Sequence, residues 1–194
     1  MQTYSIILLA AGPSDRLGRP KQLLPYKEST LLEHLIDQAK NSLAKSIVVV
    51  LGANEREIKD AINSDHINIS LNDEWKEGVA SSIRYGIAVV QNITPETDAV
   101  ILMVCDQPYV TSKLLNELIK QYEKTGKPIV TSACNNEICP PALFHQSMIP
   151  ELMQLTGDNG AANIIKIHKG NTLTVPFPKG KIDINTLADY KELS

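Results

Sequence analysis

The chain has 194 residues, of which 43% are hydrophobic and 21% are charged, and its formal net charge is −3. This length suits one domain with a sizeable core, so we expect a single domain over residues 1–194. The weak negative charge excludes a general basic surface for nucleic acid or an anionic membrane, and no window approaches the about 18 apolar residues of a membrane-spanning helix. We therefore expect neither a nucleic-acid nor a membrane partner.

The chain holds three cysteines and begins directly with strand-like sequence, without the basic and apolar regions of a secretory leader. Reduced thiols and a cytoplasmic location are expected from this pattern.

The first predicted element is a buried strand at Tyr4–Leu9. Four later runs are also short, rich in β-branched residues and almost continuously apolar, which is typical of strands in a sheet covered on both faces. These predicted strands are Ser46–Leu51, Ile67–Leu71, Ala99–Cys105 and Pro128–Ala133.

Amphipathic segments alternate with the strands and predict helices at Thr30–Ser42, Asn54–Asn63, Val79–Gln91 and Thr111–Thr125. Thr30 and Glu33 form a capping-box pattern, Asn54 is a second predicted cap, and Gly126 is a predicted helix stop. The alternation predicts an α/β fold, a Rossmann-like three-layer sandwich with a mostly parallel sheet and helices on both faces.

The rhythm changes after about Ala133. From there the sequence predicts a turn at Asn135-Asn136, a short strand at Ala142–Phe144, helices at about Gln146–Gln154 and Ala161–Lys169, a strand at Thr172–Val175 and a last helix from about Thr186. We interpret this part as a substrate-facing region on the same sheet.

The loop after the first strand, Ala10–Lys21, is the first candidate site. Gly12 lets backbone amides approach a ligand, Arg16 offers a planar fork for two phosphate oxygens, and Lys21 offers a mobile point charge. These residues favour an anion, most simply a polyphosphate. The alternative is a solvated turn with ordinary surface cations.

Asp106 follows the most hydrophobic predicted strand and precedes Gln107-Pro108. Ligands of open α/β sheets bind outside the carboxyl ends of strands, and a carboxylate there suits Mg²⁺ together with substrate phosphates. The alternative is that Asp106 caps the next helix, although Thr111 or Ser112 would serve better.

Two further segments carry candidate residues. In Asn72–Ser82, Gly78 would admit a flat ring close to the backbone, and Ser81 and Ser82 would hydrogen-bond a base or a phosphate; the alternative is that a serine is a simple helix N-cap. In Asp183-Ile184-Asn185-Thr186, part of a predicted strand, we expect either Asp183 or Asn185 to face a metal and the other to cap a helix or pair with the backbone. Asn185 as the N-cap of the last helix is the alternative.

These motifs together resemble the MobA-like nucleotidyltransferase family, and within it most closely the molybdenum cofactor cytidylyltransferases. The resemblance rests on five segments in family order: LAAGPSDRLGRPKQLLP (Leu9–Pro25), NDEWKEGVASSIRYGI (Asn72–Ile87), CDQP (Cys105–Pro108), LTGDNGA (Leu155–Ala161) and DINT (Asp183–Thr186).

The resemblance implies the nucleotide-diphospho-sugar transferase type of fold, Mg²⁺ as cofactor, and catalysis by Arg16, Lys21 and Asp106. Asp106 is the implied metal ligand, with Asn185 at the second ligand position and Asp183 as its substitute. The implied nucleotide-binding residues are Leu9, Ala10, Ala11, Gly12, Arg16, Lys21, Gly78, Ser81, Ser82 and Asp106.

The implied reaction is in-line attack by an acceptor phosphate oxygen on an NTP α-phosphate, with release of pyrophosphate. The resemblance favours transfer of CMP from CTP to a molybdopterin-type cofactor, a phosphorylated small molecule, and is compatible with a transient contact to a molybdoenzyme or its chaperone. Two departures stand out: Asn185 where Asp is commoner, and Ala162 where an Arg often follows the GDxGA turn. The alternatives are a nucleotidyltransferase for a sugar phosphate or another small molecule, and a nucleotide-binding accessory protein with weakened catalysis.

Overall fold

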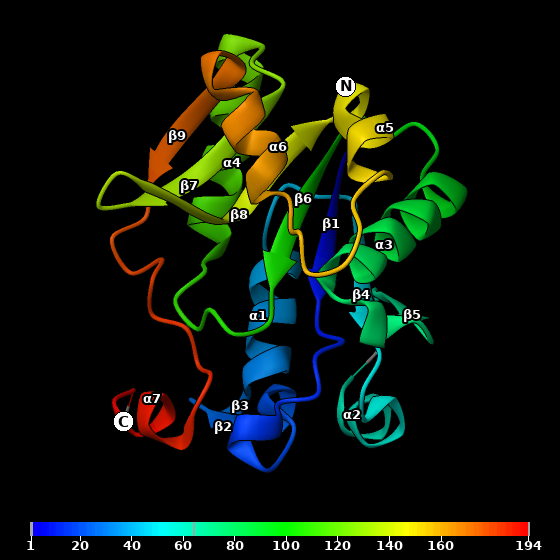
Figure 1. The fold of residues 1–194 in the computed structure, drawn as a ribbon, viewed down its shortest axis with the longest axis vertical. Coiled ribbons are helices and arrows are strands. Elements are labelled where there is room, and N and C mark those ends of the chain that lie inside the picture. The colour runs from blue at the N-terminus through cyan, green and yellow to red at the C-terminus, as the bar shows by residue number, and fades with distance from the viewer. Residues whose placement is uncertain (1, 64, 194) are drawn as a thin grey trace.

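One sheet of seven strands organises the protein, and the computed structural model describes residues 2–63 and 65–193 (Figure 1). The strands are β1 (Tyr4–Leu9), β4 (Ser46–Leu51), β5 (Asn68–Leu71), β6 (Ala99–Val104), β7 (Ile129–Cys134), β8 (Glu137–His145) and β9 (Thr172–Pro176). Their order in the sheet is β5-β4-β1-β6-β8-β7-β9, and a small hairpin of β2 (Pro25–Tyr26) and β3 (Ser29–Thr30) lies apart from it.

The sheet is mostly parallel, as the alternation of strands and helices predicts. β1 pairs in parallel with β4 and β6, β4 with β5, and β7 with β9. β8 is antiparallel to both of its neighbours, β6 and β7. The carboxyl ends of β1 and β6 therefore lie side by side, and the loops that follow them share one edge of the sheet.

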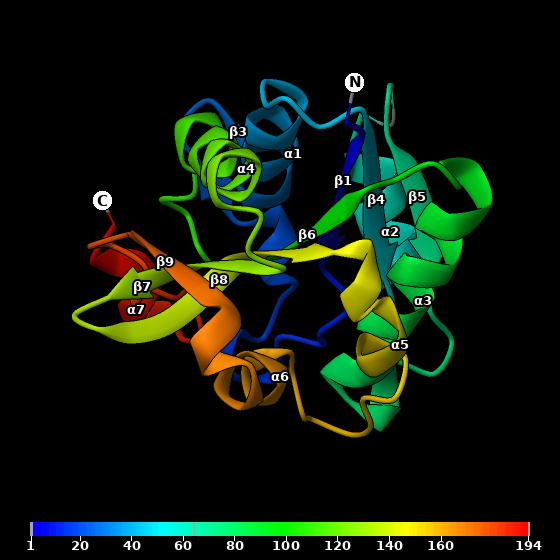
Figure 2. The same ribbon diagram turned by 90° about the horizontal axis from the view of Figure 1, so that it is seen from above.

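Helices cover both faces of this sheet. They are α1 (Leu31–Lys40), α2 (Glu55–Ala61), α3 (Val79–Ile93), α4 (Ser112–Thr125), α5 (Ile149–Leu152), α6 (Ala162–Ile167) and α7 (Leu187–Lys191). Figure 2 shows α1 and α4 on one side of the sheet and α3, α5 and α6 on the other. Among the described residues, no helix combines the length and the apolar character needed to cross a membrane.

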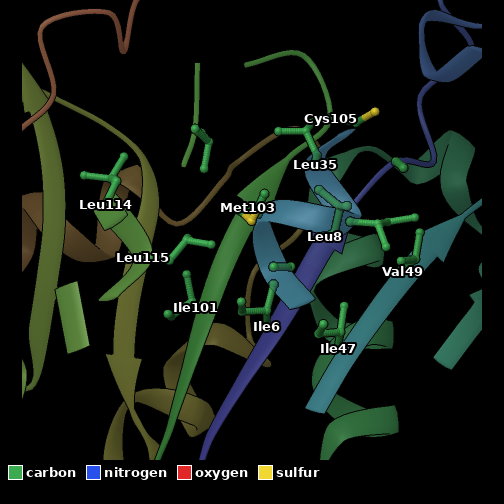
Figure 3. Close-up of a cluster of buried hydrophobic side chains, with 14 of the residues drawn as sticks. Ile6, Leu8, Leu35, Ile47, Val49, Ile101, Met103, Cys105, Leu114 and Leu115 are labelled. Carbon is green, nitrogen blue, oxygen red and sulfur yellow. The ribbon is translucent and has the colours of Figure 1, made fainter. Parts of the chain in front are cut away.

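Alternate residues of the central strands fill two hydrophobic layers. Ile6 and Leu8 of β1 are fully buried on the α1 side, in the cluster that Figure 3 shows and to which Leu35 of α1 also belongs. Ile7 is fully buried on the opposite side with Ile83 of α3. Because successive strand residues point to opposite faces, an uninterrupted apolar run is what a doubly covered strand requires. This packing holds the ends of β1 and β6 in fixed positions.

All four residues predicted to end helices lie at helix ends, and three of them cap as expected while the side chain of the fourth does not. Thr30 and Glu33 form the capping box of α1, Thr111 accepts a hydrogen bond from Leu114 N at the start of α4, and Gly126 ends α4 at φ 63°. Asn54 makes no side-chain cap for α2, because its φ of 57° is left-handed whereas a capping residue needs an extended backbone.

The part after Ala133 differs most from the prediction. β8 is nine residues long, where the sequence predicts only Ala142–Phe144, because the pairing continues past Pro140-Pro141 with a register shift opposite Thr131 and Ser132. The predicted strand around Asp183 and Asn185 is wrong. That segment is irregular, and within the described residues a backbone hydrogen bond from Ile184 N to Asp106 O, at 2.8 Å, joins it to the end of β6.

Candidate active site

A cleft of about 300 Å³ lies at the carboxyl ends of β1 and β6. Eight of the ten residues that the resemblance implies for nucleotide binding line it: Leu9, Ala10, Ala11, Gly12, Lys21, Gly78, Ser82 and Asp106. These eight residues, which come from separate segments of the sequence, therefore lie around one common cleft. Arg16 and Ser81 do not line this cleft.

The loop after β1 is held in shape by Gln22. Its amide Nε2 donates hydrogen bonds to Ala10 O at 2.7 Å and to Gly12 O at 3.2 Å, and the side chain is almost fully buried. Ala10 N donates to Val50 O at 2.9 Å, and Lys21 N donates to Ser14 Oγ at 3.0 Å. These hydrogen bonds fix the backbone of the loop, and Gln22 itself is one of the residues that line the cleft. No role was predicted for Gln22 from the sequence, because a polar residue in a predicted loop is expected to be exposed.

Lys21 joins the loop to the other two parts of the candidate site. Its Nζ lies 3.3 Å from Asp106 Oδ2 and donates to Asn185 Oδ1 at 3.0 Å. The side chain of Lys21 is 15% exposed and that of Asp106 is 27% exposed. An ammonium that is only partly hydrated and faces the cleft is well placed to meet a second anion.

Arg16 lies in a short 3₁₀ turn, Asp15–Leu17, and faces a neighbouring hollow of about 300 Å³ that Lys21 and Asn185 also line. The backbone amides of Asn185 and Thr186, and then the charge of Arg16, hold the pKa of Asp189 below its usual range. Arg16 thus lies toward the start of α7 and, unlike Lys21, does not line the cleft.

Asp183 is half-buried beside Asp106. Burial raises the pKa of Asp183 to about 6, and the negative charge of Asp106 adds to the effect. Its Oδ1 is buried without a hydrogen-bond partner. The charge of Lys21 acts in the opposite direction on Asp183, so this carboxylate lies near the same two groups that Asn185 approaches through its hydrogen bond from Lys21 Nζ.

The two serines of α3 are tied to Asn72 rather than capping the helix. Asn72 Nδ2 donates to Ser81 Oγ at 2.9 Å and to Ser82 Oγ at 3.0 Å, and Asn72 itself is buried. Ser81 Oγ donates to Gly78 O at 2.9 Å. The N-cap alternative is wrong, because Gly78 occupies the cap position. Of the two serines, only Ser82 lines the cleft.

Gly78 is required by a close approach of the chain to itself. Its φ of 116° is a conformation that side chains rarely adopt, and a Cβ there would lie 2.4 Å from Gly157 C and 2.6 Å from Asp158 Oδ1. Ala80 N donates to Gly157 O at 3.0 Å. The segment Leu155–Gly160 therefore forms a wall of the cleft, and Asp158 contributes to its lining.

Arg84 fastens the same wall from α3. Its guanidinium donates to Leu155 O at 2.5 Å and to both carboxylate oxygens of Glu77, at 3.0 and 2.7 Å. A planar fork that bridges a carboxylate and a carbonyl restrains both partners. The wall is thus anchored at Leu155 and Gly157.

The oxygen atoms around Lys21 suit a divalent cation. The carboxylate of Asp106 and the amide oxygen of Asn185 already converge on one cationic nitrogen. Mg²⁺ commonly takes one or two protein oxygens and completes its shell with water and substrate phosphates. Within residues 2–63 and 65–193, no group of three or more His, Cys, Asp or Glu side chains is placed to hold a metal by itself. A cation held by Asp106 and Asn185 would take its other ligands from phosphate and water.

Comparison with known proteins identifies several that are similar to this chain in sequence. A molybdenum cofactor cytidylyltransferase from Escherichia coli is 27% identical over 119 residues, which cover 61% of this chain and 59% of that protein. A probable molybdenum cofactor guanylyltransferase from Bacillus mycoides is 29% identical over 115 residues, 59% of this chain and 54% of that protein. A nicotine blue oxidoreductase from Paenarthrobacter nicotinovorans is 29% identical over 141 residues, 72% of this chain and 66% of that protein. The chain thus spans less than two thirds of each of these relatives.

Solved structures share the fold over nearly the whole chain. Rv0371c from Mycobacterium tuberculosis is 27% identical, with a TM-score of 0.83 and coverage of 99% of this chain and 97% of that one. A structure of Rv0371c in complex with manganese is 26% identical, with a TM-score of 0.79 and coverage of 100% and 98%. The family model of the MobA-like NTP transferase domain matches residues 6–173, from β1 into β9. With the cleft, the sheet and this match in agreement, the chain belongs to the family of MobA-like NTP transferase domains.

Proposed function

We propose that the protein is a Mg²⁺-dependent nucleotidyltransferase that transfers CMP from CTP to a molybdopterin-type cofactor. The observation that carries the proposal is the contact of Lys21 Nζ with both Asp106 Oδ2 and Asn185 Oδ1. It brings the anion-binding loop, the candidate metal carboxylate and the C-terminal oxygen ligand to one point beside the cleft.

In the proposed reaction, a phosphate oxygen of the acceptor forms a bond to the α-phosphorus of CTP. The bond from that phosphorus to the oxygen bridging the α- and β-phosphates breaks, and the leaving oxygen departs with its electron pair as part of pyrophosphate. No side-chain nucleophile is needed, so catalysis consists of positioning and of neutralising charge.

The residues of the cleft divide this work. The exposed backbone of Gly12, in the loop fixed by Gln22, receives the triphosphate, and Lys21 stabilises the negative charge that grows on the phosphates. Arg16 approaches the same phosphates from the neighbouring hollow. When bound, Mg²⁺ on Asp106 and Asn185 supplies further charge neutralisation at the α-phosphate. Gly78, Ser82 and the backbone of Leu9–Ala11 face the base and the ribose.

The choice of CTP is supported by sequence rather than by geometry. Ala10-Ala11-Gly12 resembles the loops of cytidylyl and uridylyl transferases more than those of the guanylyl branch, and one relative is a molybdenum cofactor cytidylyltransferase. The relative named as a guanylyltransferase makes GTP the competing nucleotide.

A second function, nucleotide binding with weakened catalysis, is favoured by one observation. Asn185 is neutral where a carboxylate would hold a cation more strongly, and its oxygen is engaged by Lys21. In this case Mg-CTP would bind and no pyrophosphate would form.

The test measures thermal stabilisation by Mg-CTP and Mg-GTP, and then pyrophosphate release from each in the presence of molybdopterin. We expect larger stabilisation by CTP and release of pyrophosphate that depends on molybdopterin. Stabilisation by GTP but not CTP would remove the cytidylyl assignment. Tight CTP binding without pyrophosphate release, across other small phosphorylated acceptors as well, would establish the second function.

A further inference from the structure

The segment Phe177–Asn185 joins β9 to the cap of α7, and we call it the C-terminal strap (Figure 1). It carries Asn185, the candidate metal ligand whose oxygen accepts a hydrogen bond from Lys21 Nζ. The strap contains neither helix nor strand. Because no regular hydrogen-bond ladder fixes it, the place of Asn185 depends on the contacts that individual residues of the strap make.

The dipeptide Asp106-Gln107 holds the strap at two points. Ile184 N donates a hydrogen bond to Asp106 O at 2.8 Å, and Gln107 Nε2 donates to Gly180 O at 2.8 Å. Ile184 is also buried, so its side chain anchors this end of the strap in the core. Asp106 supplies one candidate metal ligand, and the dipeptide that contains it also fixes the segment that supplies the other.

Gln107 is almost fully buried, at 2% exposed. Within the described residues its Oε1 has no hydrogen-bond partner, so only the amide nitrogen is satisfied. This amide also lies close to Asp183: burial and the charge of Asp106 raise the pKa of that carboxyl, and hydrogen bonding from Gln107 opposes the rise. A buried amide with an unpaired oxygen costs free energy that an apolar side chain would not. The contact with the strap is what offsets this cost.

We propose that Gln107 is a positioning residue: by holding Gly180 O, it keeps the strap where Asn185 presents its oxygen to a divalent cation. Gln107 lines neither the cleft nor the hollow beside Arg16, so it acts through the strap and not by touching the nucleotide. This inference rests on the proposed metal-dependent transfer and deepens it. Groups that orient a metal ligand from behind typically change metal affinity by about 10–100-fold when they are removed.

Gly180 gives a second way to disturb the same contact. A Cβ at Gly180 would lie 2.5 Å from Cys139 Sγ and 2.7 Å from Phe177 Cδ1, both far below van der Waals contact. The strap is therefore packed against β8 at the residue whose carbonyl is bonded to Gln107. Gly180→Ala cannot fit unless the strap or these side chains shift, and it leaves the amide of Gln107 intact.

Two glutamines provide a matched pair of variants. Gln107→Met keeps the length of the side chain and removes its donor. Gln38→Met is the control, because Gln38 Oε1 accepts a hydrogen bond from Ser112 N at 3.1 Å and joins α1 to α4. Each substitution removes one hydrogen bond between a glutamine and the backbone. A general loss of stability would therefore appear in both variants, whereas a displaced metal ligand would appear only in Gln107→Met.

The first measurement is Mn²⁺ binding to the full chain, followed by electron paramagnetic resonance with α,β-methylene CTP, an analogue that cannot transfer its nucleotide. Mn²⁺ prefers the same oxygen ligands as Mg²⁺. We expect Gln107→Met and Gly180→Ala to weaken Mn²⁺ binding by about tenfold or more, and the affinity for the analogue in EDTA to stay within about twofold. The double variant should be little weaker than either single one, because both substitutions act on one contact. Gln38→Met should leave both affinities within about twofold of the wild type.

The second measurement is amide hydrogen exchange, which reports on the strap without any ligand. The amide of Ile184, bonded to Asp106 O, should exchange about tenfold faster in Gln107→Met and at the wild-type rate in Gln38→Met. A wild-type rate in Gln107→Met would show that Gln107 does not hold the strap, and would overturn the inference.

Mn²⁺ affinity at the wild-type level in folded Gln107→Met, or an equal loss in Gln38→Met, would also overturn it. Should Gln107→Met fail to fold, the comparison of Gly180→Ala with Gln38→Met decides in the same way. Absence of Mn²⁺ binding by the wild type with the analogue bound would overturn it too, since there would be no cation to position. A wild type that binds Mn²⁺ with the expected dependence on Gln107, yet releases no pyrophosphate with any acceptor, would contradict the proposed function alone.

Discussion

Lys21 Nζ lies 3.3 Å from Asp106 Oδ2, and this contact joins two segments that are 85 residues apart in the chain. Lys21 belongs to the loop after β1, and Asp106 follows β6. The two strands are parallel neighbours from Tyr4 opposite Ala99 to Leu9 opposite Val104. The pair is thus a direct product of strand register, and it sets a cation and a carboxylate at the same edge of the sheet.

Asp106→Asn keeps the shape of the side chain and removes its charge. We expect the rate of pyrophosphate release to fall by about 10²–10³, the usual cost of losing one preorganised charged contact. The free energy of unfolding should change by less than about 1 kcal/mol, since a partly exposed ion pair contributes little. Steady-state kinetics and chemical denaturation check both numbers. A rate within tenfold of the wild type would remove Asp106 from the mechanism.

Arg16→Met and Arg19→Met form a matched pair in the same loop. Arg16 lines the hollow shared with Lys21 and Asn185, whereas Arg19 is an exposed residue that lines neither space. Arg16→Met should weaken Mg-CTP binding by about tenfold, the effect of losing one charge-assisted hydrogen bond. Arg19→Met should change it by less than about twofold. Calorimetry at fixed ionic strength measures both affinities for Mg-CTP. An equal loss of affinity in the two variants would show that Arg16 acts only through the overall positive charge of the loop.

Gly78→Ala tests the wall that Leu155–Gly160 forms. The added methyl would lie 2.4 Å from Gly157 C, and the φ of 116° adds backbone strain. Gly126→Ala is the control, because its φ is 63° and nothing lies within 4 Å of its added Cβ. We expect Gly126→Ala to cost about 1 kcal/mol from strain alone, and Gly78→Ala to cost a further 1–3 kcal/mol or so from overpacking. Urea denaturation measures the loss of unfolding free energy in each variant. Equal losses would mean that the Leu155–Gly160 segment moves to accommodate the added methyl group at no cost.

The sequence predicted the architecture well where local pattern and global fold agree. The strands β1 and β4 have the predicted ends, because a doubly covered strand must be apolar at every position and its borders are then sharp. The meeting of Lys21 and Asp106 follows from the rule that ligands bind at the carboxyl ends of parallel strands.

The supporting hydrogen bonds could not be predicted in the same way. Gln22 binds backbone carbonyls that carry no sequence signal, and Asn72 binds Ser81 and Ser82 only because β5 and α3 are brought together by the sheet. The alternation around Ile184 resembled a strand, yet no strand of the described residues pairs with it, and a tertiary contact to Asp106 O fixes it instead. Whether a strand-like segment forms a strand depends on a neighbouring strand with which it can pair, and a single sequence does not show that partner.

Asn185→Asp tests whether the neutral amide limits the site. In the present structure Asn185 accepts a hydrogen bond from Lys21 Nζ at 3.0 Å, so a carboxylate of the same shape can keep that contact. The added negative charge should strengthen binding of Mn²⁺ or Mg²⁺ by about tenfold, since each carboxylate ligand raises the affinity of oxygen sites for divalent cations. Calorimetry with each metal, with and without CTP, measures this directly. Asp183→Asn is the control: Asp183 Oδ1 has no hydrogen-bond partner among the described residues, and the half-buried carboxylate carries a pKa raised to about 6. We expect that variant to leave metal affinity within about threefold of the wild type. The reverse ranking, with metal binding lost in Asp183→Asn and unchanged in Asn185→Asp, would make Asp183 the second ligand in place of Asn185.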